Sequence, residues 1–323
     1  MSSPFVVSAS PHIRDRLDAA RVMWWVVVAL LPAAVASVYI FGARSLLVIL
    51  VSVAACLATE TLTQLVLRRP VTVADGSAVV TGLLLAFTSP ARSPWWMMVI
   101  GAVIAIFLVK QLFGGLGYNI FNPALAARAV LLSSWPAVMT AWSEPVRSFL
   151  RVDVVTAASP LGLMKEAART QAAFSPPSYL NLLLGNIPGS LGETCKVALL
   201  AGALLLLALK IVDWRTPLAF MAGLALLSLA LGRNPLFDLL SGGAVLGAFF
   251  MATDLVTSPT TKSGRWIFGG ACGLLTTLIR AYGGFPEGVC YAILFMNCLN
   301  PLIEQYFRPR RFGAAGLKKE AAQ

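Results

Sequence analysis

Long apolar runs separated by short polar stretches follow one another along most of the chain. The first run, Val22–Phe41, is long enough for a helix to cross a bilayer, which takes roughly 20 apolar residues. It follows a polar, charged stretch, and no convincing small-residue cleavage site comes after it, so we expect a membrane span rather than a signal peptide. The further predicted spans are Leu46–Leu67, Ser77–Ser89, Trp95–Phe113, Pro123–Met139, Cys195–Val212, Pro217–Leu231, Pro235–Ala252, Trp266–Arg280 and Pro286–Ile303.

This pattern predicts an all-α polytopic membrane protein with about ten transmembrane helices, several of them short or broken. Composition agrees, because 58% of the residues are hydrophobic and only 12% are charged. A soluble domain carries about 25% charged residues, so an ordinary soluble enzyme and a disordered chain are both excluded. The net charge is +11, but the positive residues are scattered between apolar runs, which indicates a lipid bilayer and no nucleic acid as partner.

The distribution of lysine and arginine predicts the topology of the spans. With the N-terminus in the cytoplasm, most positive residues of the short loops and tails fall on the cytoplasmic side, as positive charge does in membrane proteins. We therefore expect residues 1–21 and the basic tail 306–323 to be cytoplasmic. The polar stretch 143–193 is then an extracytoplasmic loop of a multi-pass protein.

A repeat divides the apolar part of the chain into two halves. Thr88-Ser89-Pro90 recurs as Thr257-Ser258-Pro259, and Gly114-Gly115 recurs as Gly283-Gly284, with the same offset in both cases. The halves, 22–142 and 194–305, then contain five spans each. An odd number of spans forces the two copies into opposite orientations, so the pattern predicts two inverted five-helix repeats.

The third span of each half is short or interrupted by glycine and proline, near residues 75–90 and 238–259. Matched broken helices are a pointer to a site near the middle of the membrane, because their ends present free backbone groups to a ligand or ion. The same inverted architecture is found in permeases. A solute or ion permease is therefore one alternative to any redox function.

Cysteine and histidine give little support for metal chemistry. The five cysteines include no C-x-x-C pair, and His12 is the single histidine. A zinc site, a four-cysteine iron–sulfur site and a catalytic triad are therefore not expected. A metal site made of carboxylates and carbonyls stays open, and the sequence predicts no catalytic residue.

The polar loop contains a stretch of small residues from Asp153 to Leu161, closed by proline. Taken alone, it is a turn in which Asp153 caps a helix. It also resembles the flavinylation motif D-x-x-[ST]-G-A-[ST], in which FMN is joined through its phosphate to a hydroxyl side chain. Ser159 stands at the acceptor position, with Asp153, Thr156 and Ala158 at other motif positions and Ala157 where glycine is usual.

The chain as a whole resembles the D subunit of the Rnf electron-transport complex, a relative of the B subunit of the Na⁺-translocating NADH:quinone oxidoreductase. The resemblance runs from roughly Ser10 to Phe307. The matching stretches are Ser10-Pro11-His12-Ile13, Asp75-Gly76-Ser77 through Thr88-Ser89-Pro90, Gly114 through Ala124, Gly189-Ser190-Leu191-Gly192-Glu193, Phe250-Met251-Ala252-Thr253-Asp254 and Pro286-Glu287-Gly288-Val289.

This resemblance implies a flavoprotein subunit in the inner membrane of a bacterium. The complex would move electrons between ferredoxin and NAD through covalent FMN and couple this to the transport of Na⁺ or H⁺. Partners would be the other Rnf subunits, above all the flavin-bearing G subunit and the membrane A and E subunits, and a flavin transferase would load Ser159. No G-x-G-x-x-G follows a strand, so the chain is not catalytic alone.

Asn119 and Asn122 precede Pro123, where the fifth predicted span begins. Asparagine before proline is a normal start of a helix, so capping is one interpretation. In the quinone-reductase relative this stretch lies near a non-covalent riboflavin. By resemblance, these two amides would hydrogen-bond the edge of such a second flavin.

Glu60, Asp254 and Glu304 are acidic residues in or at the ends of apolar runs. Ionisable groups at membrane depth are costly and mark functional sites by default, so all three are candidates for cation binding or coupling. Asp254 could instead pair with a loop arginine, and Glu304 could lie among lipid headgroups beside Arg308. A final alternative is a scaffold subunit without redox function, in which the Ser159 hydroxyl would be dispensable.

Overall fold

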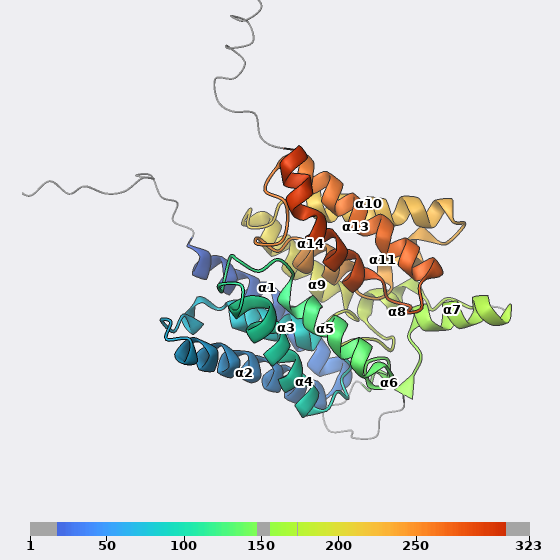
Figure 1. Ribbon diagram of the computed structural model, residues 1–323. Coiled ribbons are helices and arrows are strands. Elements are labelled where there is room, and N and C mark those ends of the chain that lie inside the picture. Colours follow the sequence, from blue (N-terminus) through green and yellow to red (C-terminus); the bar gives the residue numbers. More distant parts are fainter. Residues whose placement is uncertain (1–17, 147–155, 173, 308–323) are drawn as a thin grey trace, which may run out of the picture.

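The computed structural model describes residues 18–146, 156–172 and 174–307, and these fold almost entirely into helices (Figure 1). The elements of the first half are α1 (Ala19–Phe41), α2 (Ala43–Val66), the short 3₁₀-helix η1 (Val73–Asp75), α3 (Ser77–Phe87), α4 (Trp95–Val103), which continues as the π-helix η2 (Ile104–Gln111), α5 (Pro123–Ser134) and α6 (Pro136–Met139).

The polar stretch between the halves has its own structure. Strands β1 (Trp142–Ser143) and β2 (Thr156–Ala157) pair antiparallel, and they are followed by α7 (Pro160–Thr170) and α8 (Tyr179–Leu184). The second half consists of α9 (Lys196–Ala208), α10 (Arg215–Ala230), α11 (Pro235–Leu240), α12 (Ala244–Leu246), the π-helix η3 (Gly247–Met251), α13 (Lys262–Tyr282) and α14 (Val289–Tyr306).

Local sequence explains where several helices begin. The Asn122 side chain accepts hydrogen bonds from two backbone N–H groups of α5, with proline at the first helical position, and Asn234 caps α11 in a similar way. Pro136 separates α6 from α5, so the predicted span Pro123–Met139 is two helices. The predicted span Pro235–Ala252 is likewise broken, into α11, α12 and η3.

The helices of the two halves match at the offset of the sequence repeat. Shifted by this offset, which takes Thr88 to Thr257, α5 falls on 292–303, inside α14, and α4 with η2 falls on 264–280, inside α13. The short α3 falls on 246–256 and overlaps η3. The predicted short and broken third spans are thus found in both halves. Their inverted orientation in a membrane stays a prediction.

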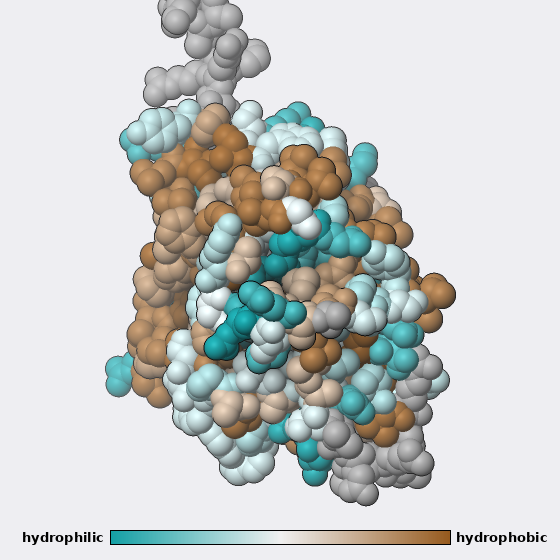
Figure 2. Space-filling model, turned by 90° about the vertical axis from the view of Figure 1, so that its right-hand side faces the viewer, coloured by the Kyte–Doolittle hydropathy of each residue, from teal (hydrophilic) through white to brown (hydrophobic). Residues whose placement is uncertain are grey.

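Two of the described helices, α1 and α2, are long and apolar enough to cross a membrane. The apolar helices α3, α4 with η2, α5, α9 and α10 are shorter. Large apolar side chains of the long helices point outward, such as Val35 with 68% of its surface exposed. Figure 2 shows apolar side chains over much of one face, with hydrophilic ones gathered near its centre. The crossing of all ten predicted spans stays a prediction.

The halves pack together through α1 against α9 and α5 against α14. Gly202 allows the first contact, because a Cβ atom there would lie 1.9 Å from the carbonyl oxygen of Ala29. The start of α1 and the end of α14 lie at one end of the bundle, and α7 lies at the other (Figure 1). The described ends of the chain therefore lie away from the polar segment, and the side of the membrane on which each lies stays a prediction.

Candidate functional site

A pocket with about 740 Å³ of empty space lies between the two halves, and we call it the central pocket. Its lining from the first half includes Ser77, Lys110, Asn119 and Asn122, and its lining from the second half includes Asp254. Three of the residues singled out in the sequence are thereby brought to one place. Polar groups from both halves therefore converge on one largely apolar pocket, which is the usual character of a small-molecule site.

Both asparagines make hydrogen bonds within their own turn. Asn122 Oδ1 accepts from the backbone N–H groups of Ala124 at 3.1 Å and Leu125 at 3.3 Å, which confirms the capping interpretation. Asn119 Nδ2 donates to the carbonyl oxygen of Phe121 at 3.0 Å. Their side chains still border the central pocket, so capping and ligand contact do not exclude one another.

Asp254 lies in the turn after η3, where its carboxylate organises the following residues. One oxygen accepts from the Val256 N–H at 3.4 Å, and the other from the Thr257 hydroxyl at 3.2 Å. Within the described ranges no lysine or arginine forms an ion pair with it, so the predicted alternative of a loop-arginine partner is not seen there. The carboxylate reaches the central pocket without a paired charge.

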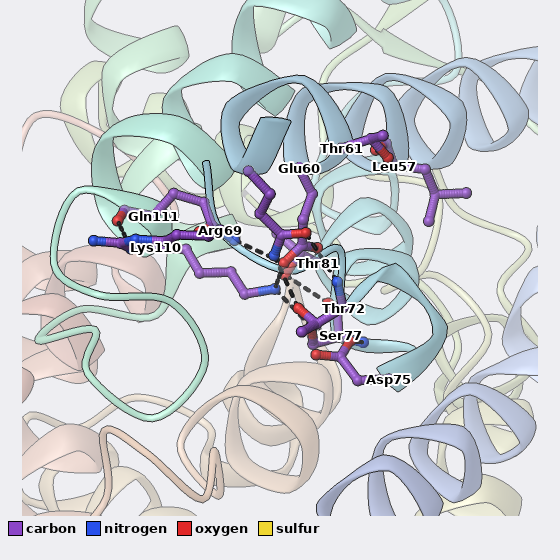
Figure 3. A network of polar contacts seen from close by, with 11 residues as sticks. Leu57, Glu60, Thr61, Arg69, Thr72, Asp75, Ser77, Thr81, Lys110 and Gln111 are labelled. Carbon is purple, nitrogen blue, oxygen red and sulfur yellow. Dashed lines mark hydrogen bonds and ion pairs between the residues drawn. The ribbon is translucent and has the colours of Figure 1, made fainter. Parts of the chain in front are cut away.

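Glu60 is buried on α2, with 1% of its surface exposed, and it lies behind the lining of the central pocket. Figure 3 shows Lys110 reaching it from η2. Lys110 Nζ lies 2.6 Å from Glu60 Oε1, and Gln111 Nε2 donates to the same oxygen at 2.8 Å. The other carboxylate oxygen, Oε2, is buried and has no hydrogen-bond partner among the described residues.

The Lys110 ammonium also donates to the hydroxyl of Ser77 at 2.6 Å, and that hydroxyl lies 2.5 Å from Asp75 Oδ1. We call Glu60, Ser77, Lys110 and Gln111 the Glu60 site. Gly76 makes the turn before Ser77, because its φ of 79° is in the left-handed region that favours glycine. Lys110 and Gln111 stand in a π-helical segment, a feature that often occurs at functional sites.

Lys110 was not among the residues singled out in the sequence. The signal that could have found it is its place near the end of an apolar run, since the rule that marks buried acids applies equally to buried lysines. Ser77 and Gln111 carried no such signal. Their part depends on partners in distant helices, Lys110 for Ser77 and Glu60 for Gln111.

Ser159 lies in a second, smaller pocket with about 250 Å³ of empty space. It is the N-cap of α7, and its hydroxyl oxygen accepts from the backbone N–H of Gly162 at 3.2 Å. Lys196, Glu193 and Glu287 line the same pocket. Lys196 is fully buried, and its ammonium donates to the backbone carbonyl of Glu193.

The other motif positions differ in their surroundings. Thr156 is exposed in β2, opposite Ser143, and Ala158 is exposed in the turn before Ser159. Ala157 pairs with Trp142 and has no left-handed backbone angle, so alanine can stand where the motif usually has glycine. Asp153 lies outside the described residues.

Glu304 lies apart from both pockets. One of its oxygens accepts from the backbone N–H of Thr260 at 3.0 Å and from the hydroxyl of the same residue at 2.9 Å. These bonds tie α14 to the turn before α13. Arg308, the partner considered from the sequence, lies outside the described residues.

A second buried carboxylate, Asp238 on α11, was not singled out in the sequence. Arg233 donates to both of its oxygens, at 2.7 Å each, and the Ser228 hydroxyl donates to Oδ2 at 2.8 Å. Arg280 in the last turn of α13 donates to the Asp238 carbonyl at 2.5 Å and lies 3.9 Å from Oδ1. We call these four residues the Asp238 site. A further buried pair joins the halves, Arg128 of α5 with Glu287.

Among the charged groups outside the apolar helices, Asp213 and Lys165 have pKa values that their neighbours shift. Asp213, between α9 and α10, is partly buried, which alone would raise its pKa, but hydrogen bonds from Arg215 and Arg265 outweigh this and lower it. Burial, together with Arg169 and Arg233, lowers the pKa of Lys165 on α7. The Lys165 ammonium donates to carbonyls at Gly283 and Phe285 and so anchors α7 to the second half.

Comparison with known proteins gives matches along nearly the whole chain. A family model described as "NQR2, RnfD, RnfE family" matches residues 6–313. A protein of Acetobacterium woodii, named as the D subunit of a Na(+)-translocating ferredoxin:NAD(+) oxidoreductase complex, is 47% identical over 98% of this chain and 97% of its own length.

Two further relatives carry related names. A Clostridium ljungdahlii protein, named as the D subunit of a proton-translocating ferredoxin:NAD(+) oxidoreductase complex, is 43% identical, over 96% of each chain. A Vibrio cholerae serotype O1 protein, named as the D subunit of an ion-translocating oxidoreductase complex, is 38% identical, over 96% of this chain and 99% of its own. The similarity therefore covers both halves and the segment between them.

Proposed function

The chain belongs to the NQR2, RnfD, RnfE family, and on that premise we propose that it is the D subunit of an Rnf-type complex, in which electron transport drives ion translocation. Relatives of nearly the same length carry this name, so the proposal concerns the whole chain and not one domain. The other subunits of such a complex are its expected partners, because the described residues form no nicotinamide-binding sheet.

The observation that carries the redox part is the position of Ser159 at the start of α7. The N-terminus of a helix favours phosphate, because free backbone N–H groups and the helix dipole point there. Lys196 brings one positive charge to the same pocket. The hydroxyl, the helix N-terminus and the lysine favour FMN attached through its phosphate to Ser159, and of the two carboxylates that line the same pocket, Glu287 is paired with Arg128.

The Ser159 pocket is small, so its residues would hold the phosphate end of FMN only. The chain would thereby orient the ring toward a partner subunit outside this pocket. When bound, FMN supplies a carrier that takes up and releases electrons.

The central pocket supports the remaining parts of the proposal. Its two asparagines and its apolar lining favour a second, non-covalent flavin such as riboflavin. Asp254 in its lining and Glu60 behind Lys110 are the proposed coupling carboxylates. Glu304 is the weakest of the three candidates, because its hydrogen bonds hold a turn away from both pockets. The relatives are named for Na⁺ in one species and for protons in another, so both ions stay open.

The test is in-gel flavin fluorescence after denaturation, with the protein co-expressed with a flavin transferase. We expect a fluorescent band for the wild type and for Thr170→Ala, a control that removes an exposed hydroxyl on α7 outside the motif. The band should vanish in Ser159→Ala. A band that persists in Ser159→Ala would overturn attachment at this residue, and the absence of a band in the wild type would overturn covalent FMN.

A permease is the second candidate, because the central pocket lies between two halves that match at one offset. It predicts that transport does not depend on Ser159. Ion movement into proteoliposomes that contain the Ser159→Ala complex decides between the two functions, since a redox-driven subunit would lose coupled transport.

A further inference from the structure

The Glu60 site holds a lysine where a metal cation would have suitable ligands. Lys110 Nζ lies 2.6 Å from both Glu60 Oε1 and Ser77 Oγ, which come from two different helices (Figure 3). Carboxylate and hydroxyl oxygens are the kinds of ligand that hard cations such as Na⁺ take. The ammonium group therefore occupies a position that a small monovalent cation could also fill.

One oxygen of the Glu60 carboxylate is also available to coordinate a cation. Glu60 Oε2 is buried and without a hydrogen-bond partner among the described residues, although it belongs to the same carboxylate that Lys110 contacts. An ammonium is a point charge, and this one faces a single oxygen of the carboxylate. A metal cation at the same place could bind both oxygens of Glu60, together with the Ser77 hydroxyl.

Lys110 has room to leave. Its side chain lines the central pocket, and its four-carbon stem is flexible. The lining of that pocket also includes Asp254, a carboxylate without a paired lysine or arginine in the described residues. A displaced ammonium would therefore move into open space that contains a negative charge.

We infer that Lys110 is a tethered internal cation, which competes with a small monovalent metal cation for the Glu60 carboxylate and the Ser77 hydroxyl. When the metal cation binds, Lys110 swings into the central pocket. This inference rests on the ion-translocating role proposed above and deepens it. Each metal cation that binds at Glu60 moves the positive charge of Lys110 into the central pocket, so cation binding at Glu60 is linked to the charge of a ligand bound in that pocket. Asp75, partly exposed and bonded to Ser77, connects the site toward the surface.

The test is a Na⁺ titration of the assembled complex, read by thermal unfolding and by ²³Na NMR line width, with choline chloride at matched ionic strength. Lys110→Met removes the competing charge and keeps the chain length. If the displaced state is populated to about a tenth in the wild type, the apparent Kd for Na⁺ falls roughly tenfold in the variant. LiCl is titrated in parallel.

Lys110→Arg should act in the opposite direction. A planar guanidinium can contact both oxygens of a carboxylate, so it would occupy Oε2 and weaken the Na⁺ response. The double variant Glu60→Gln with Lys110→Met keeps the site neutral and should lose the response. Lys165→Met is the matched control: it removes a lysine on α7 that bonds backbone carbonyls and lies outside the Glu60 site, so it should leave the Kd unchanged.

The inference is overturned if Lys110→Met has the same Kd as the wild type both for Na⁺ and for Li⁺. It is also overturned if the double variant still responds to Na⁺. If the variants do not assemble, the wild type still gives an answer. Amine labelling of Lys110, read by mass spectrometry, should increase with NaCl and not with choline chloride, and labelling that ignores NaCl overturns the inference. Flavin fluorescence from Ser159 is measured separately, so its loss affects the proposed function alone.

Discussion

The Glu60 site and the Asp238 site are both buried ion pairs, but they use their carboxylates differently. The repeat offset takes Lys110 to position 279, next to Arg280, so the two cations stand at nearly equivalent places in their halves. The Asp238 carboxylate receives hydrogen bonds on both oxygens. The Glu60 carboxylate receives two on one oxygen and none from the described residues on the other.

This difference indicates that the Asp238 site is structural, whereas the Glu60 carboxylate has an oxygen, free among the described residues, that can bind a cation. The guanidinium of Arg233 meets both oxygens of Asp238, which is the geometry in which arginine holds a carboxylate firmly. The Glu60 site borders the central pocket through Lys110 and Ser77, whereas no member of the Asp238 site is among the residues that line it. We therefore expect damage at Asp238 to affect stability and damage at Glu60 to affect coupling.

The largest effect on stability should come from Asp238→Ala. It leaves Arg233 and the fully buried Arg280 without their carboxylate, and breaking a buried pair in this way costs about 3–5 kcal/mol. The measurement is denaturant unfolding of the purified protein in detergent. Glu304→Gln, which keeps an acceptor outside both buried sites, is the control and should cost much less. A loss below about 1 kcal/mol for Asp238→Ala would contradict a structural role.

A smaller loss of stability is expected for Glu60→Gln, together with a larger loss of function. The amide oxygen can still accept from Gln111 and Lys110, so only the opposite charge is lost, and the cost should stay below the roughly 3–5 kcal/mol of a buried pair whose partner is removed. Ion transport by the reconstituted complex should nevertheless fall strongly while electron transfer through the flavin continues. If the Glu60→Gln complex still couples ion transport to electron transfer, the Glu60 site has no more functional role than the Asp238 site.

The smallest effect belongs to the accessible ion-pair cluster at Asp213, which lies outside both buried sites. Hydrogen bonds from Arg215 and Arg265 lower its pKa in the folded state below the usual value of 3.8. Its contribution to stability is therefore complete above about pH 4 and is lost as the pH falls below that value. The side chains of this cluster are partly exposed, and ion pairs near the surface contribute about 0.2–1 kcal/mol.

The check is the pH dependence of unfolding in the wild type and in Asp213→Asn. The two curves should differ by this small amount at pH 7 and converge at the acid end. If the free energies of unfolding of the wild type and the variant stay equally far apart down to the lowest pH measured, the ion pairs of Asp213 with its arginines do not stabilise the fold.

The sequence by itself determined most of the elements of this fold. A run of apolar residues is a local property, and each of the ten predicted spans coincides with helical structure, although Pro136 and the region 235–252 break two of them. Caps are local as well, so Asn122 before Pro123 fulfilled its expected role. The offset between the repeated tripeptides likewise predicted the matching order of helices in the two halves, and family membership followed from motifs along the chain.

Only the tertiary structure decided which residues share a site. Glu60 and Lys110 lie on different helices far apart in the chain, and their contact exists because α2 packs against α4 and η2. Asp254 joins Asn119 and Asn122 because the broken helix of one half faces the other half, while Ser159 belongs to a separate pocket and Glu304 to a turn outside both. The physical reason is that hydrophobicity and capping act between near neighbours in the chain, whereas a buried charge must find its partner through the packing of distant helices.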